Sequence, residues 1–218
     1  MHLSYYILLI LFIAQNIFLA QDLEITQSGM QTFYFQDPQN RNQIMFTNEA
    51  LVETFNGMTT EVRGEISFDP AQLQNTFNGN ISTTVKSIKT GIDIRDEDLR
   101  SERWLDAKKY PEISFNVSKV EDVIQLAPNK LILSLVGDFS LRGKTKPIMV
   151  DFTLTFLEES ELTKKRIAGD LLSLVGNFEI YLPDYGIQNA FMPSRVSQKL
   201  VVTVNIVGTN KKPMSHKE

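Results

Sequence analysis

Alternation of apolar and polar residues runs through most of the chain beyond residue 60. Because successive side chains of a β-strand point to opposite faces, this pattern predicts strands with one apolar face. The alternating rows cover residues 62–68, 81–85, 113–117, 131–141, 148–156, 172–180 and 200–206, and weaker strands are predicted over 32–36 and 43–48. Many antiparallel strands of this kind predict an all-β fold, either a sandwich or a closed barrel.

The alternation stops in a segment that is dense in charges of both signs, and we predict a short helix over residues 94–103. Acidic residues at 96–98 come before Arg100 and Arg103, an order that suits the helix dipole. Leu99 and Trp104 would anchor this helix to the strands. The acidic cluster lacks the spacing and the glycine of a calcium loop, so we interpret it as a solvated helix face.

Two of the predicted strands resemble each other closely. Residues 133–141 read LSLVGDFSL and residues 172–180 read LSLVGNFEI, which puts Gly137 and Gly176 at the same position of the apolar row. A glycine inside a strand permits a bend or a close approach of another group. Either the two strands share packing needs, or both glycines leave room for a ligand. On the second interpretation, Gly137→Leu would leave the protein folded but weaken ligand retention.

The first twenty residues contain no Lys, Arg, Asp or Glu, and residues 7–14 form a continuous apolar run. This pattern predicts a secretory signal peptide over residues 1–20, with cleavage after Ala20. An uncleaved membrane anchor is the alternative. We therefore expect an exported protein, periplasmic or extracellular, with a flexible tail over residues 209–218.

Composition narrows the possible chemistry. The chain has 218 residues and a net charge of −4, with no basic block that would suit nucleic acid. It has no cysteine, which excludes disulfides and thiolate chemistry. Its two histidines, His2 and His216, lie at the ends of the chain, so a serine–histidine–aspartate triad or a histidine metal site is not expected. We expect neither enzymatic activity nor a metal or cofactor.

A series of short motifs resembles the YceI-like family, the polyisoprenoid-binding, lipocalin-like group of exported bacterial proteins. The central motifs are Ser87-Ile88-Lys89-Thr90-Gly91, Arg95-Asp96, Leu99-Arg100-Ser101, Asp106 and Lys109-Tyr110-Pro111-Glu112-Ile113-Ser114-Phe115. Flanking matches are Val62-Arg63-Gly64, Gly137-Asp138-Phe139, Leu141-Arg142-Gly143, Thr145-Lys146-Pro147 and Tyr185-Gly186-Ile187. They keep their order over about residues 24–208, so we expect one YceI-like domain over residues 21–208.

The resemblance implies an elongated antiparallel lipocalin-like β-barrel with a short helical insertion. It also implies that the barrel holds a long-chain isoprenoid, of the quinone or prenyl-phosphate type, or a similar amphiphilic lipid. The expected lining residues are Ile81, Val85, Leu99, Trp104, Ile113, Phe115, Leu133, Leu135, Gly137, Val150, Phe152, Phe178 and Val202. For each of them, simple filling of the core is the alternative, because every barrel must also be packed.

Arg95, Arg100 and Arg142 are candidates for an anionic head group, although for each of them we favour a surface ion pair with Asp96, Asp98 or Asp138. Loading would involve transient contact with a membrane and a mobile mouth, for which residues 90–111 are the candidate segment. A ligand-free structural or stress-protective barrel is the alternative function. Both a monomer and a homodimer remain open.

Overall fold

The computed structural model describes residue 25 and residues 27–213, and within them it contains ten strands and two short α-helices. The strands are β1 Gln31–Tyr34, β2 Gln43–Glu49, β3 Thr54–Thr59, β4 Val62–Phe68, β5 Asn78–Thr84, β6 Glu112–Ala127, β7 Lys130–Leu141, β8 Lys144–Leu157, β9 Leu171–Tyr181 and β10 Lys199–Thr209. The helices are α1 Leu73–Thr76 and α2 Asp93–Arg100. The expected leader over residues 1–20 lies outside the described residues.

The strands form a closed antiparallel barrel. Strands β4 to β10 pair in chain order, and β1 closes the ring by pairing with β4 on one side and with β10 at Tyr34 and Thr209 on the other. The ring therefore has eight strands. The remaining edge of β10 pairs with β2, from Val201 opposite Thr47 to Asn205 opposite Gln43, and β3 extends the sheet from β2. The prediction of an all-β barrel is confirmed.

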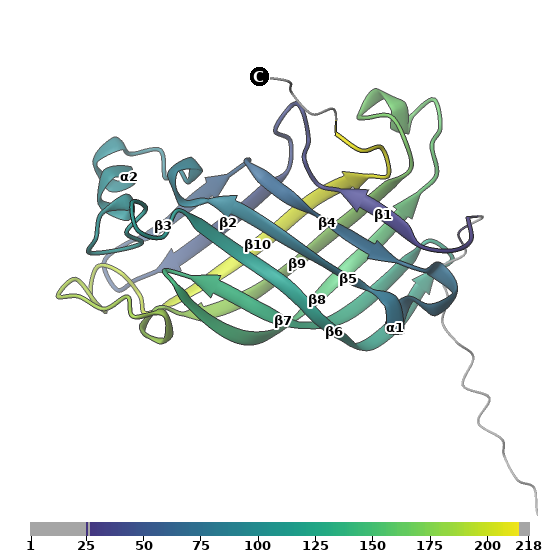
Figure 1. The fold of residues 1–218 in the computed structure, drawn as a ribbon. Helices are drawn as coiled ribbons and strands as arrows, with labels where there is room; N and C mark the ends of the chain where they lie inside the picture. The colour runs from purple at the N-terminus through teal and green to yellow at the C-terminus, as the bar shows by residue number, and fades with distance from the viewer. Residues whose placement is uncertain (1–24, 26, 214–218) are drawn as a thin grey trace, which may run out of the picture.

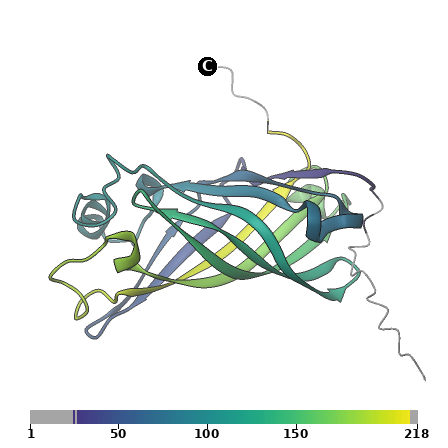
Figure 2. The ribbon, with the colours of Figure 1, turned by 60° about the horizontal axis from the view of Figure 1, so that its bottom comes forward.

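The barrel is elongated, and its two ends differ (Figure 1). Helix α2, the hairpin of β2 and β3 and the connection between β9 and β10 extend from one end, whereas α1 lies at the other (Figures 1 and 2). Helix α2 begins at Asp93, one residue before the segment predicted to be helical, and ends at Arg100, three residues before the predicted end.

Two strands depart from the predictions. Strand β3 was not expected, because its sequence TFNGMT has little alternation; its Gly57 makes room for the ring of Phe46 on β2, since a Cβ there would lie 2.2 Å from a ring carbon. Strand β6 is much longer than the row over 113–117 that predicted it. Register shifts after Val117, Val120 and Gln125 break its alternation, as β-bulges do.

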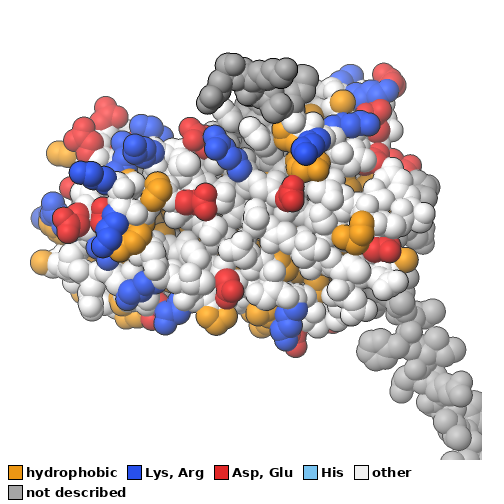
Figure 3. Space-filling model, viewed as in Figure 1, with side chains coloured by type: hydrophobic (Ala, Val, Ile, Leu, Met, Phe, Trp, Pro, Cys, Tyr) orange, Lys and Arg blue, Asp and Glu red, His pale blue; other side chains and the backbone are white. Residues whose placement is uncertain are grey.

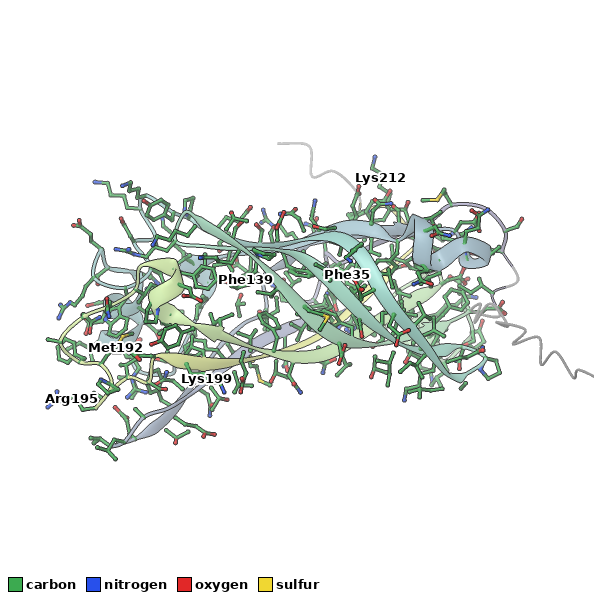
Figure 4. The ribbon with its side chains drawn as sticks, turned by 90° about the horizontal axis from the view of Figure 1, so that it is seen from below. Phe35, Phe139, Met192, Arg195, Lys199 and Lys212 are labelled. Atoms are coloured by element: carbon green, nitrogen blue, oxygen red, sulfur yellow. The ribbon has the colours of Figure 1, made fainter. Side chains whose placement is uncertain are left out.

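The half of the barrel nearer α1 is filled by a cluster of phenylalanines. Phe33 stacks on Phe68 with ring centroids 5.8 Å apart, and Phe68 stacks on Phe77 at 5.6 Å. Phe156 meets Phe33 edge-on at 6.1 Å. These rings and their aliphatic neighbours are buried, and Figure 4 shows Phe35 further along the same interior. Close-packed side chains thus occupy the interior of this half.

Candidate functional site

The other half of the barrel contains a cavity of about 430 Å³. This volume lies within the usual range for small-molecule sites, about 300–1,000 Å³. Its inner wall is apolar and includes Phe139. Figure 4 shows Phe139 between Phe35 and the end of the barrel that carries Met192 and Arg195. The exposed residues Ile94 and Arg195 also line it, so the cavity reaches the surface at the end of the barrel that carries α2.

Ten of the thirteen expected lining residues lie on the cavity wall. They are Ile81, Leu99, Trp104, Ile113, Phe115, Leu135, Val150, Phe152, Phe178 and Val202. Most come from the inward rows of the barrel strands, as alternation predicts, and Leu99 and Trp104 come from α2 and the turn after it. That these side chains contact a ligand stays a prediction.

The other three expected residues do not line the cavity. Val85 is buried in the 3₁₀ turn Val85–Ser87, where its N–H donates to the carbonyl oxygen of Pro111 at 2.9 Å. Leu133 is completely buried in the hydrophobic core. Gly137 is covered by the ring of Phe115. Alternation predicted the inward direction of Leu133 and Gly137 but carried no information about what covers them.

The repeated glycines both serve aromatic packing. A Cβ at Gly137 would lie 2.5 Å from a ring carbon of Phe115, and a Cβ at Gly176 would lie 2.7 Å from a ring carbon of Phe152. Each glycine therefore accepts a phenylalanine from the neighbouring strand. The interpretation that these glycines leave space for a ligand is wrong, and shared packing needs explain the repeat. Both phenylalanines line the cavity, so the glycines shape its wall indirectly.

Sequence reasoning missed part of the wall. The missed residues include Ile44 and Phe46 on β2, Phe55 on β3, and Phe191 and Val196 in the β9–β10 connection. The β2 and β3 segments have weak alternation, and the connection has none. Nothing local in these segments marks their side chains as inward-facing, because their position depends on how the chain returns across the mouth.

The mouth is framed by three segments that are tied together. Arg95 of α2 forms an ion pair with Glu53 at 3.0 Å, and its guanidinium lies 4.5 Å from the ring centroid of Phe55. Arg103 lies 5.5 Å from the ring centroid of Phe191 in the β9–β10 connection. These contacts join α2 and the turn after it to the two neighbouring segments beside the opening.

The loop between β2 and β3 also contacts the β9–β10 connection directly, because the N–H of Val52 donates to the carbonyl oxygen of Ser194 at 3.2 Å. The three segments therefore form a closed set of contacts around the opening. In the space-filling view, charged side chains of both signs gather at this end of the molecule, with hydrophobic ones among them (Figure 3).

Asp96 differs from the expectation of a solvated acidic face, because it is buried. It accepts hydrogen bonds from the backbone N–H of Thr90 at 2.6 Å and from the Thr90 hydroxyl at 2.8 Å. Burial acts to raise the pKa of Asp96, but these hydrogen bonds and the charges of Lys89 and Arg100 lower it below its ordinary value. The carboxylate thus links α2 to Thr90, in the segment before the helix.

The candidate head-group arginines have different environments. Arg142 donates to the carbonyl oxygens of Gly186 and Glu102, both at 2.9 Å, so it joins two loops. Arg100 faces Asp96 at 3.9 Å. Of the three arginines, Arg95 alone lines the cavity, and it is paired. Arg195, which sequence reasoning missed, also lines the cavity and is exposed, and it has no ion-pair partner among residues 27–213.

The described part of the chain contains no group of three or more histidine, aspartate or glutamate side chains arranged to hold a metal ion. Among the same residues, no helix has both the length and the apolar character needed to cross a membrane.

Solved structures of similar fold include BcnA from Burkholderia cenocepacia, with a TM-score of 0.62 and 15% identity over 79% of this chain and 99% of that one. A polyisoprenoid binding domain from Saccharophagus degradans, implicated in plant cell wall breakdown, has a TM-score of 0.60 and 11% identity, covering 83% of this chain and 99% of that one. At these identities the similarity shows the fold alone.

Curated relatives include a UPF0312 protein from Pseudomonas savastanoi, 30% identical over 133 residues, which are 61% of this chain and 62% of the relative. Protein YceI of Escherichia coli is 26% identical over 133 residues, 61% of this chain and 63% of the relative. The matched region thus spans less than two thirds of either relative. A family model described as a YceI-like domain matches residues 34–208, most of the chain. This protein therefore belongs to the YceI-like domain family.

Proposed function

We propose that the protein is a non-enzymatic, exported carrier that holds a long-chain isoprenoid, of the quinone or prenyl-phosphate type, or a similar amphiphilic lipid. The observation that carries this proposal is the apolar cavity that opens at one end of a YceI-like barrel. Support comes also from the fold shared with a domain described as polyisoprenoid-binding. Removing a prenyl chain from water favours binding by about 0.8 kcal/mol for each buried methylene.

The cavity limits how such a lipid would bind. Its volume of about 430 Å³ suits one chain, and the phenylalanine cluster blocks the far half of the barrel. A long isoprenoid would therefore place one part in the cavity and leave the rest at or beyond the mouth. Arg195 and the Arg95–Glu53 pair stand at this mouth, where a polar or anionic head group would meet them.

Native mass spectrometry of the protein purified from its own envelope tests the proposal, followed by organic extraction and identification of any lipid. We expect a stoichiometric isoprenoid or other long-chain amphiphile. Val202→Phe adds a ring on the cavity wall and should lower lipid occupancy by tenfold or more, as loss of about 1.4 kcal/mol would. Val201→Phe adds the same ring on the opposite face of β10 and should retain the lipid.

An empty protein that also stays empty when offered isoprenoids and fatty amides would contradict the proposal. The alternative function, a ligand-free structural or stress-protective barrel, would then be favoured. This alternative assumes that side chains fill the whole interior of the barrel, as they fill the half nearer α1.

A further inference from the structure

Four large aliphatic side chains stand in water around the mouth of the cavity. Leu51 and Val52, in the loop between β2 and β3, are 89% and 71% exposed. Ile92 and Ile94, at the start of α2, are 46% and 73% exposed. Exposed apolar side chains that gather at one place on a soluble domain mark a surface for interaction.

These four residues belong to one rim. The ion pair between Arg95 and Glu53 joins the segments that carry them, with a nitrogen–oxygen distance of 3.0 Å. Ile92 and Ile94 also line the cavity. The apolar surface is therefore continuous from the cavity wall to the exposed rim, and a lipid leaving by this mouth would pass along it.

Charged groups of both signs lie beside the apolar tips, and the two ion pairs among them are less exposed than Leu51, Val52 and Ile94. The Arg95 and Glu53 side chains are 25% and 48% exposed, and Arg103 and Asp98 form a second pair at 3.6 Å. Arg195 adds a cation without an ion-pair partner among the described residues. A zwitterionic membrane presents phosphate anions and ammonium cations at the same depth, so mixed pairs match it in charge.

We propose that the rim formed by Leu51, Val52, Ile92 and Ile94 seats the protein on the surface of a lipid bilayer, with the cavity mouth facing the membrane. The aliphatic tips insert at the boundary between head groups and acyl chains, and the paired charges remain among the head groups. A lipid can then move between bilayer and cavity without crossing water. This last step rests on the proposed function, whereas the seating itself does not.

The chemistry of the rim favours a bilayer over a protein partner. The centres of protein interfaces are enriched in tyrosine, tryptophan, phenylalanine, methionine and arginine. The exposed tips here are leucine, valine and isoleucine, carried by a hairpin loop and a helix start. They project from the end of the barrel at two sides of the opening, a form that suits insertion into a fluid surface.

The test measures partition of the full-length protein onto vesicles of phosphatidylcholine by flotation. The rim variant is Leu51→Asn with Ile94→Asn. The matched control is Met149→Asn with Leu162→Asn, which removes two exposed apolar side chains from β8 and from the β8–β9 loop. Both variants keep residues 1–24, so any contribution of that segment is the same in all samples.

We expect the parent to bind phosphatidylcholine vesicles at both low and high salt. Each inserted aliphatic side chain contributes about tenfold to partition, so the rim variant, which loses two of them, should bind about a hundredfold more weakly, and the control should bind within about twofold of the parent. Absence of parent binding, equal losses in both variants, or binding that needs anionic lipid and disappears in high salt would each overturn the proposal.

A second measurement keeps this inference separate from the proposed function. Trp104, the single tryptophan of the chain, lines the cavity, so its fluorescence reports occupancy by a short-chain ubiquinone without vesicles present. The rim variant should bind this quinone as the parent does. If the parent partitions onto vesicles but never binds the quinone or any extracted lipid, the proposed function fails while the membrane seating stands.

Discussion

The ring of Phe115 lies so close over Gly137 that a Cβ at residue 137 would stand 2.5 Å from its Cζ atom. The same Cβ would stand 2.5 Å from the carbonyl oxygen of Asn116. Side chains do not approach one another this closely, so glycine is required for the ring to take this position. Phe115 is part of the cavity wall, and Gly137 therefore shapes that wall by leaving space for the Phe115 ring.

Gly137→Ala should accordingly destabilise the fold. Because Asn116 contributes a backbone atom, the clash cannot be relieved by rotating one side chain, and we expect a loss of about 1–3 kcal/mol in the free energy of unfolding. Urea denaturation measures it. Asp138→Ala, on the exposed face of the same strand, is the control and should change stability little. A fully stable Gly137→Ala protein would contradict this account.

Arg95→Ala should loosen the mouth. The substitution removes both the ion pair with Glu53 and the contact with the Phe55 ring, which together hold α2 to the β2–β3 hairpin. Because the pair is partly exposed, we expect less than about 1 kcal/mol of lost stability. Dissociation of a bound quinone should become several-fold faster. Stopped-flow measurement of the recovery of Trp104 fluorescence gives the dissociation rate.

The control for Arg95→Ala is Lys164→Ala, which removes exposed ion pairs with Glu159 and Glu161 in the β8–β9 loop, away from the mouth. Its dissociation rate should equal that of the parent. Equal acceleration in both variants would show that the effect does not come from the mouth.

Asp96 should make stability depend on pH in the acid range. Burial acts to raise its pKa, but the hydrogen bonds from Thr90 and the charges of Lys89 and Arg100 together lower the pKa in the folded protein. The carboxylate therefore contributes its full stabilisation above the ordinary aspartate pKa of about 4, and this contribution is lost as the pH falls further, through the lowered pKa. Urea unfolding measured from neutral pH to about pH 3 follows the loss.

Asp96→Asn should remove this pH-dependent contribution. We expect a loss of about 1.5–3 kcal/mol at neutral pH, the contribution of hydrogen bonds to a charged group, and a smaller difference from the parent in acid. Asp93→Asn, an exposed position on the same helix, serves as the control. If Asp96→Asn and the parent differ by the same amount at every pH, the lowered pKa of Asp96 does not contribute to stability.

Phe35→Ala should lengthen the cavity. Phe35 is fully buried. Its N–H donates to the carbonyl oxygen of Gly64, two residues before the cavity residue Ile66. Its ring covers Gly208, two residues after the cavity residue Ile206. Removing the ring should cost about 3–5 kcal/mol and shift binding toward longer isoprenoid chains, measured by competition between quinones of different length.

Phe77→Ala is the matched control for Phe35→Ala, because it removes a buried ring that stacks on Phe68 next to α1, at the packed end. It should destabilise the protein similarly without changing the preferred chain length. Circular dichroism ensures that only folded protein is compared. An identical shift in both variants would point to general loosening of the core instead of a longer cavity.

Much of the barrel could be read from the chain. Alternation predicted the strands between residues 62 and 206, because a sheet with one buried face places every second side chain in the core. This pattern is visible in a few consecutive residues of the sequence. The same rows supplied most of the cavity wall, including Phe115, Val150 and Val202. The bulged end of β6 and the weakly alternating β3 escaped prediction because their geometry breaks the period of two.

The occupants of the interior depended on contacts between distant segments. Alternation shows that Gly137 and Leu133 face inward, but it cannot show that Phe115 covers the first or that the second lies in the core instead of on the cavity wall. The sequence around Asp96 indicates a surface carboxylate, and only the structure shows that it accepts a hydrogen bond from the N–H of Thr90. A cavity is the volume that remains after all strands have packed, and that remainder is a property of the folded chain as a whole, because no single segment encloses it.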